Sequence, residues 1–199
     1  MTIKKYVANE TGFSGHRWPQ HRSEVSEFVA LMRLYDARSY LEIGCLNGDT
    51  LHHIGTRMPR GSRVVGVDLP RTHEVYADAP DCLMRAASDL CRLGQDARVI
   101  VGDSHDQAVV KRVRALGPFD ALLIDGDHST AGVLADWENY GPMARLVGIH
   151  DAHKLRRVRE VYEKLAARHE SRLILLNEEI GIGIGVIFCE PLTPPQPAA

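Results

Sequence analysis

Four acidic residues and one glycine each come at the end of a short run of Val, Ile and Leu in this chain. These residues are Gly44, Asp68, Asp103, Asp125 and Asp151. A carboxylate in such a place can accept hydrogen bonds from hydroxyl or amino groups, or bind a cation. If the apolar runs are parallel strands, their carboxyl ends meet at one edge of a sheet, where ligands bind in open α/β folds. The spacing therefore predicts a single polar cleft.

The first run ends in a glycine turn, LEIGCLNG, at residues 41–48. Glycine lets the backbone turn tightly and approach a ligand, and the free amides that begin the next helix favour an anionic group. A plain turn between a strand and a helix explains this motif equally well. Asp68, about 20 residues further on, favours the ligand-binding interpretation of this turn. An acid at the tip of the second strand can accept hydrogen bonds from both hydroxyls of a ribose. Asp103 can accept a hydrogen bond from an amino group on a purine edge.

A second group of polar residues follows the fourth and fifth runs. Asp125 and Asp151 end consecutive runs, so their carboxylates are expected within a few ångströms and can hold a divalent cation with waters. Such a cation anchors a substrate hydroxyl and lowers its pKa. His128 can then remove the proton, since its unperturbed pKa lies near ~6.5. The alternatives are that Asp125 is an ordinary rim acid and that His128, Asp127 or Ser129 caps the next helix.

The elements that position these residues alternate between apolar runs and stretches with helical spacing. Such alternation indicates βαβ units and a doubly wound sheet. We expect a Rossmann-like α/β fold with seven strands, mostly parallel, helices on both faces and an antiparallel C-terminal hairpin strand. The predicted strands lie within residues 39–44, 63–68, 98–103, 119–125, 145–151, 172–177 and 181–190.

The predicted organisation has three parts. Residues 1–22 form an irregular arm, in which His16 and Trp18 are candidates for a lid over the cleft. Residues 23–190 form the main domain, beginning with a helix that Ser23 caps. Residues 191–199 are a proline-rich flexible tail.

Composition excludes several classes of protein. The 199 residues carry 24 Lys and Arg against 26 Asp and Glu, so we expect no nucleic-acid partner. No apolar run approaches the ~18 residues of a membrane span, and the N-terminus lacks the apolar core of a secretory signal. The 4 cysteines are scattered, which is typical of reduced thiols and predicts a cytoplasmic protein.

Four segments carry a resemblance to a known family: LEIGCLNG, GVDLP, VGDS and LLIDGDHSTAGVLADWENYGPMARLVGIHDAH. Over residues 40–188 the chain resembles class I S-adenosylmethionine-dependent methyltransferases. The last segment is similar to the branch with macrolide-sugar O-methyltransferases and cephalosporin hydroxylase-like proteins. The resemblance implies S-adenosyl-L-methionine as cofactor and places it against the residues Glu42, Gly44, Cys45, Asn47, Gly48, Asp68, Asp103, Ser104 and Asp125.

In the metal-dependent relatives, the first Asp of a D-G-x-H motif and an acidic pair after the next strand bind magnesium, and the motif's His acts as base. The resemblance thus implies Asp125 and His128 as catalytic residues, with Asp125, His150 and Asp151 around Mg²⁺ or Mn²⁺. The acidic pair reads His150-Asp151 here, and imidazole is a poor magnesium ligand. The usual P-G-G turn before this strand is also shortened. Asp136, on the helix after His128, is interpreted as a structural anchor.

The function predicted from these residues is methyl transfer to a hydroxyl of a small-molecule substrate, with a divalent metal as an optional aid. A nicotinamide-dependent oxidoreductase is the first alternative, although the turn lacks the G-x-G-x-x-G spacing. A non-catalytic cofactor-binding module of the same fold is the second. Because no inserted acceptor domain is evident, self-association into a homo-oligomer is one way to complete the acceptor pocket.

Overall fold

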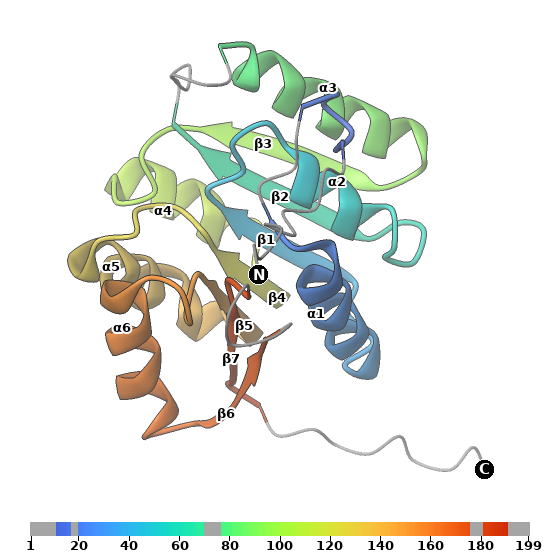
Figure 1. The fold of residues 1–199 in the computed structure, drawn as a ribbon. Coiled ribbons are helices and arrows are strands. Elements are labelled where there is room, and N and C mark those ends of the chain that lie inside the picture. The colour runs from blue at the N-terminus through green and yellow to red at the C-terminus, as the bar shows by residue number, and fades with distance from the viewer. Residues whose placement is uncertain (1–10, 17–19, 70–76, 176–180, 191–199) are drawn as a thin grey trace, which may run out of the picture.

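The computed structural model describes residues 11–16, 20–69, 77–175 and 181–190 (Figure 1). Strands and helices alternate along almost the whole chain, as the sequence predicts. The elements are α1 (Arg22–Leu34), β1 (Ser39–Ile43), α2 (Asp49–Gly55), β2 (Arg63–Asp68), α3 (Ala79–Arg92), β3 (Asp96–Val101), α4 (Gln107–Arg114), β4 (Phe119–Ile124), α5 (Thr130–Tyr140), the 3-10 helix η1 (Gly141–Met143), β5 (Ala144–His150), α6 (Arg156–Ala166), β6 (Glu170–Ile174) and β7 (Ile184–Phe188).

The seven strands form one sheet in the order β3-β2-β1-β4-β5-β7-β6. The first five pair in parallel, and β7 runs antiparallel to both of its neighbours. The predicted Rossmann-like sheet with an antiparallel C-terminal strand is therefore confirmed. The strand order reverses between β1 and β4, which is the place where the crossover helices leave on opposite faces and a cleft opens.

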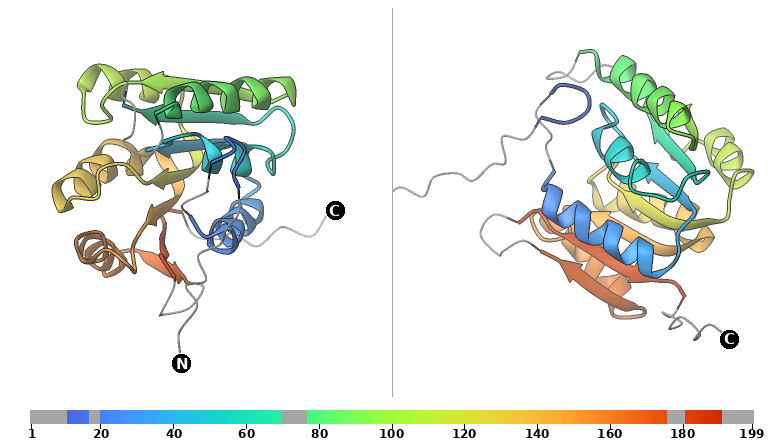
Figure 2. Two further views of the ribbon diagram at one scale, coloured as in Figure 1. Left: turned by 45° about the horizontal axis from the view of Figure 1, so that its top comes forward. Right: turned by 90° about the vertical axis from the view of Figure 1, so that its right-hand side faces the viewer.

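Helices α1, α2 and α3 cover one face of this sheet, and α4, α5 and α6 cover the other (Figure 2). Apolar residues of α1, α2 and α3 join one buried cluster, and those of α4, α5 and α6 join the other. The central strands are buried on both sides because both faces are covered. The edge strand β3 has a mixed burial pattern instead, with Val101 47% exposed.

Several predicted boundaries shift in the structure. The first helix begins at Arg22 with His21 in the N-cap position, so the prediction that Ser23 caps it is wrong. The shortened turn before β5 forms a 3-10 helix, and β5 still pairs in parallel with β4 from Ala144 to Ile149. Trp18 and the tail lie outside the described residues. Across the described ranges, no helix has the length and apolar character that crossing a bilayer requires.

A substitution at Leu123, on β4, tests the hydrophobic core on the α1 side of the sheet. It is fully buried, so Leu123→Ala should remove about 2–5 kcal/mol from the free energy of unfolding. Leu34→Ala is the matched control, because Leu34 is 65% exposed and should change stability by less than ~0.5 kcal/mol. Urea denaturation measures both. Equal losses in the two variants would contradict the assignment of the core.

Candidate active site

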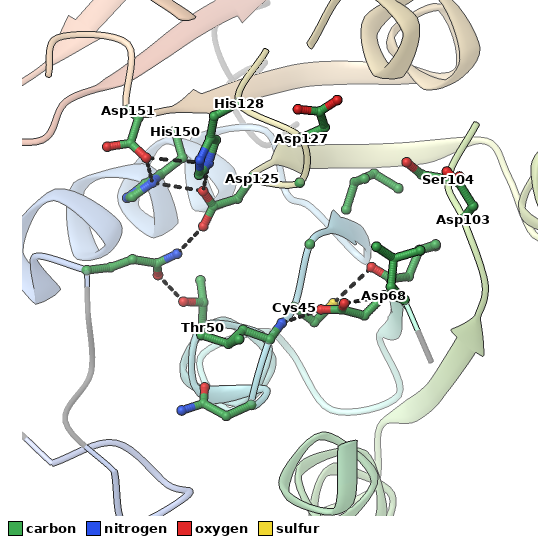
Figure 3. Close-up of a pocket in the computed structure, with 18 of the residues that line it drawn as sticks. Cys45, Thr50, Asp68, Asp103, Ser104, Asp125, Asp127, His128, His150 and Asp151 are labelled. Atoms are coloured by element: carbon green, nitrogen blue, oxygen red, sulfur yellow. Dashed lines mark hydrogen bonds and ion pairs between the residues drawn. The ribbon is translucent and has the colours of Figure 1, made fainter. Parts of the chain in front are cut away.

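A cavity of about 1020 Å³ opens beyond the carboxyl ends of the parallel strands (Figure 3). The five predicted rim residues, Gly44, Asp68, Asp103, Asp125 and Asp151, all line it. They come from five different strand ends, and the parallel pairing brings those ends to one edge. The predicted single cleft is therefore present.

The glycine turn is shaped by its contact with the neighbouring strand. Gly44 has φ +86°, and a Cβ there would lie 2.2 Å from the carbonyl oxygen of Asp125. Only glycine permits this backbone conformation and approach without strain. Gly48 is the N-cap residue of α2, with φ +80°, and packs against α3, where a Cβ would lie 2.9 Å from Ala86. Gly48 does not line the cavity, whereas Gly44 forms part of its wall.

Asp68 holds the turn in place from the tip of β2. Its carboxylate accepts hydrogen bonds from the backbone amide of Leu46 and, at 2.6 Å, from that of Leu69. Cys45 and Asn47 also line the cavity. The side-chain amide of Asn47 donates to the Ser14 hydroxyl at 3.1 Å, which ties the turn to the N-terminal arm.

Glu42 lies beneath the cavity and not in its wall. The side chain is 1% exposed and accepts a hydrogen bond from the Tyr40 hydroxyl at 2.6 Å. Burial raises the pKa of Glu42 to about 8 even though the Tyr40 hydrogen bond lowers it, and Asp125 and Asp68 add to the rise. The four acids of the rim surround the cavity, and Glu42 lies behind them.

Asp103 and Ser104 follow β3 at the other side of the cavity (Figure 3). Asp103 is mostly exposed, while the Ser104 hydroxyl donates to Asp136 at 2.8 Å. His105, also in the cavity wall, has its Nε2 atom 3.2 Å from the same carboxylate. Asp136 is fully buried, and burial raises its pKa to about 6. It anchors the loop after β3 from behind, in agreement with the interpretation from sequence.

At the β4 and β5 ends, two carboxylates and two imidazoles form a closed ring (Figure 3). His128 Nε2 lies 3.1 Å from Asp125 Oδ1 and 3.4 Å from Asp151 Oδ2. His150 Nδ1 lies 3.0 Å and 3.5 Å from the same two oxygens. Asp151 reaches this position because its backbone adopts φ +60°, an uncommon conformation for a residue with a side chain.

The ring strongly shifts the protonation of its members. Burial alone would raise the pKa of Asp125, but His150 and His128 beside it lower the pKa to about 2. Burial alone would lower the pKa of His150, yet Asp125 and Asp151 raise it to about 10. The hydrogen bond with Asp125 raises the pKa of His128. Positive charge is therefore strongly favoured between the two carboxylates.

Of the proposed helix caps, Ser129 takes the role and His128 does not. The Ser129 hydroxyl accepts from the backbone amide of Gly132 at 3.0 Å and in turn donates to Asp127 at 2.9 Å. His128 is consequently left to face Asp125 and Asp151, and its side chain is 40% exposed.

Sequence reasoning missed Gln20 and Thr50. The side-chain amide of Gln20 donates to Asp125 Oδ2, and its carbonyl accepts from the Thr50 hydroxyl. Gln20 lies 105 positions from Asp125 in an arm without periodicity, so no local pattern indicates this contact. His16, a predicted lid residue, pairs with Asp78 at 2.7 Å, and its role as a lid stays a prediction.

The Rossmann-like sheet places the glycine turn and the acidic rim at the carboxyl ends of the strands, which is where open α/β folds bind their ligands. The chain belongs to the methyltransferase domain family, whose model matches residues 41–153, more than half of its length. The resemblance to methyltransferases is thereby confirmed. No curated protein is significantly similar to the chain.

Solved structures share the fold at low sequence identity. The O-methyltransferase TomG from Streptomyces achromogenes, in complex with SAM, has a TM-score of 0.62 at 16% identity, covering 84% of this chain and 80% of its own. An O-methyltransferase from Bacillus cereus, in complex with SAH, gives 0.63 at 18%, covering 84% and 81%. Cofactor-bound Rv0187 from MTB gives 0.64 at 18%, covering 87% and 82%.

The raised pKa of the buried Glu42 predicts how the free energy of unfolding depends on pH. Its pKa is raised from 4.5 to about 8 in the folded state, so the folded protein holds this proton more tightly than the unfolded chain. The resulting stability is fully present below about pH 4.5 and is lost as pH rises toward 8, at about 1.4 kcal/mol per pH unit at most.

Glu42→Gln removes this titration, so its free energy of unfolding relative to the native sequence should rise from pH 5 to pH 8. Urea denaturation at several pH values measures the difference. Glu138→Gln, on the exposed side of α5, is the matched control and should show no such trend. A pH-independent difference for Glu42→Gln would contradict the raised pKa.

Proposed function

We propose that this protein transfers the methyl group of S-adenosylmethionine to a hydroxyl oxygen of a small molecule. The observation that carries the proposal is the division of one cavity into two ends (Figure 3). One end has the glycine turn, Asp68 and Asp103, which suit a nucleoside cofactor. The other end has the ring of Asp125, His128, His150 and Asp151, which suits an acceptor hydroxyl.

The residues at the first end fit the cofactor in their chemistry. Asp68 closes β2 and lies in the cavity wall, where a carboxylate is the group that accepts ribose hydroxyls in folds of this kind. Asp103 is exposed in the cavity wall, where it can accept from the adenine amino group. Gly44 leaves the wall next to Asp125 free of a side chain, so the methionine end can approach the backbone closely.

Methyl transfer needs close placement of two reactants more than it needs covalent help from the enzyme. S-adenosylmethionine supplies a methyl carbon bonded to a positively charged sulfur, and the acceptor oxygen displaces that sulfur in one step. His128, at the open side of the ring, is placed to take the hydroxyl proton as the new bond forms. Asp125 orients this imidazole through their hydrogen bond.

Two other interpretations of the site are weaker. An oxidoreductase would need a nicotinamide site, and the family match to methyltransferases does not support one. A non-catalytic module of the same family would bind the cofactor without turnover, so it differs from the enzyme only in its activity. A cytoplasmic location and self-association stay predictions.

Cofactor binding is the first test. Isothermal titration with S-adenosylhomocysteine should show binding in the micromolar range or tighter, and Asp68→Ala should weaken it by about tenfold or more, since a charge-assisted hydrogen bond is worth about 1.5–3 kcal/mol. Because Asp68 also supports the turn, the melting temperature of the variant must be measured alongside. The absence of binding up to millimolar ligand would rule out the proposed function.

Acceptor activation is the second test. His128→Asn should lower methyl transfer to a responding member of a panel of hydroxyl compounds by roughly 10²–10⁴-fold, because the general base is lost. Its affinity for S-adenosylhomocysteine should stay within about twofold, since the imidazole lies at the acceptor end. Mass spectrometry of the products measures the transfer. Unchanged activity in this variant would exclude His128 as the base, and cofactor binding without transfer to any acceptor would favour the non-catalytic module.

A further inference from the structure

Three side chains that can bind a metal ion meet outside the cavity, where the N-terminal arm contacts the start of α3. They are His16 on the arm, Asp78 at the N-cap position of α3, and Cys82 one helical turn further on. One ring nitrogen of His16, one carboxylate oxygen of Asp78 and the Cys82 Sγ atom all lie within 4.8 Å of one another. None of these three residues lines the cavity.

The helix and the arm each contribute to this cluster. Asp78 and Cys82 are four positions apart, and side chains with that spacing share one face of a helix, so Cys82 Sγ lies 3.4 Å from Asp78 Oδ2. The arm brings His16 Nε2 to 2.7 Å from Asp78 Oδ1. Ser14 holds the arm in this place, because its backbone amide and its hydroxyl donate to the Asp49 carboxylate at 2.7 and 2.9 Å.

The Asp78 carboxylate does not have the role that is usual for its position. Aspartate is favoured as an N-cap because its side chain accepts a hydrogen bond from an amide of the first helical turn. The Asp78 side chain makes no such capping bond, and its two oxygens face the imidazole and the thiol instead. The cluster, and not the helix, therefore sets the direction of this carboxylate.

The Cys82 thiol has surroundings that suit a metal ligand. Its side chain is fully buried, whereas His16 and Asp78 are partly exposed and leave one side of the cluster open to solvent. Burial raises the pKa of the Cys82 thiol, and the Arg85 guanidinium, which donates to Sγ at 2.9 Å, lowers it. An ion that binds this sulfur displaces the proton, and the Arg85 hydrogen bond then supports the thiolate.

The donor set suits zinc and excludes magnesium. Ligand atoms ~2.0–2.3 Å from one tetrahedral ion are about 3.3–3.6 Å apart, and the 3.4 Å between Cys82 Sγ and Asp78 Oδ2 is within that range. His16 and Asp78 are closer because they are hydrogen-bonded to each other, and the ion would take the place of that bond. Thiolate and imidazole select Zn²⁺ or Co²⁺, whereas Mg²⁺ prefers oxygen ligands.

We propose that His16, Asp78 and Cys82 bind Zn²⁺, with water as the fourth ligand, and that the ion fastens the N-terminal arm to α3. The ion joins a segment that precedes the first helix to the start of the third. Ser14, beside the cluster, also accepts from the side-chain amide of Asn47 at 3.1 Å, so the ion stabilises the arm against the glycine turn. The site does not depend on the proposed function.

Titration of the chelator-treated protein with Co²⁺ tests the site through its sulfur ligand. A cobalt–thiolate bond gives a charge-transfer absorption in the near ultraviolet, which carboxylate and imidazole ligands do not give. We expect this band to appear with Co²⁺, to disappear when Zn²⁺ displaces Co²⁺, and to survive about a hundredfold excess of Mg²⁺. If the native sequence shows no such band, the proposal is overturned without recourse to a variant.

Two pairs of variants identify the ligands. Cys82→Ser should abolish the cobalt band, whereas Cys91→Ser, which removes an exposed thiol from the same helix, should retain it. His16→Asn should weaken Zn²⁺ binding by about tenfold or more, since even the loss of an outer partner of a metal ligand has an effect of that size. His169→Asn removes an exposed imidazole after α6 and should bind Zn²⁺ as the native sequence does. A band that persists in Cys82→Ser would overturn the assignment.

Hydrogen exchange measures whether the ion fastens the arm. The backbone amides of Gly12, Ser14, Gly15 and His16 are all hydrogen-bonded, so their exchange reports local opening of the arm. Zn²⁺ should slow this exchange by about tenfold or more in the native sequence and leave it unchanged in Cys82→Ser. Unchanged exchange in the zinc-bound native protein would refute the fastening. Binding of S-adenosylhomocysteine to the metal-free protein tests the proposed function separately, so that each proposal can fail while the other stands.

Discussion

The parallel pairing of β1 with β4 is the constraint on which the whole site depends. At this pair the strand order reverses, and the backbone amide of Asp125 donates to the carbonyl of Ile43 at 2.8 Å. This contact sets the end of β4 directly against the glycine turn after β1. A side chain at position 44 would collide with the Asp125 backbone. The close approach of these two strand ends therefore requires glycine at position 44. The proposed cofactor end and the proposed acceptor end of the cavity meet at this point.

The partners of each buried acid determine whether its carboxyl group is protonated. Asp125 and Glu42 are both buried, yet burial raises the pKa of Glu42 to about 8, while two imidazoles beside Asp125 lower its pKa to about 2. The difference comes from the partners, because the neutral Tyr40 hydroxyl donates to Glu42, whereas Asp125 lies beside two imidazoles. One carboxyl group is thus held protonated behind the cavity, and the other is held ionised at its wall.

The antiparallel strand β7 supports the end of the cavity that is proposed to hold the acceptor. It lies between β5 and β6, and the loop before it contacts the residues that follow β5: the amides of Ala152 and His153 donate to the carbonyls of Gly183 and Ile182. Ile182 also lines the cavity. These contacts hold the turn after β5, including the left-handed Asp151, in the conformation that directs its carboxylate into the ring.

The sequence alone determines the fold class and the rim of the cavity. Runs of Val, Ile and Leu that are apolar on both faces require a covered parallel sheet, and the residue after each run must then lie at one edge. Gly44, Asp68, Asp103, Asp125 and Asp151 are predictable for this reason. Only the tertiary structure decides that Glu42, a strand residue one position before the last, is buried behind the cavity.

The contacts of Gln20 with Asp125 and the orientation of His150 are also decided by tertiary packing. They join segments that are distant in the chain or depend on side-chain angles, and neither leaves a periodic signal in the sequence.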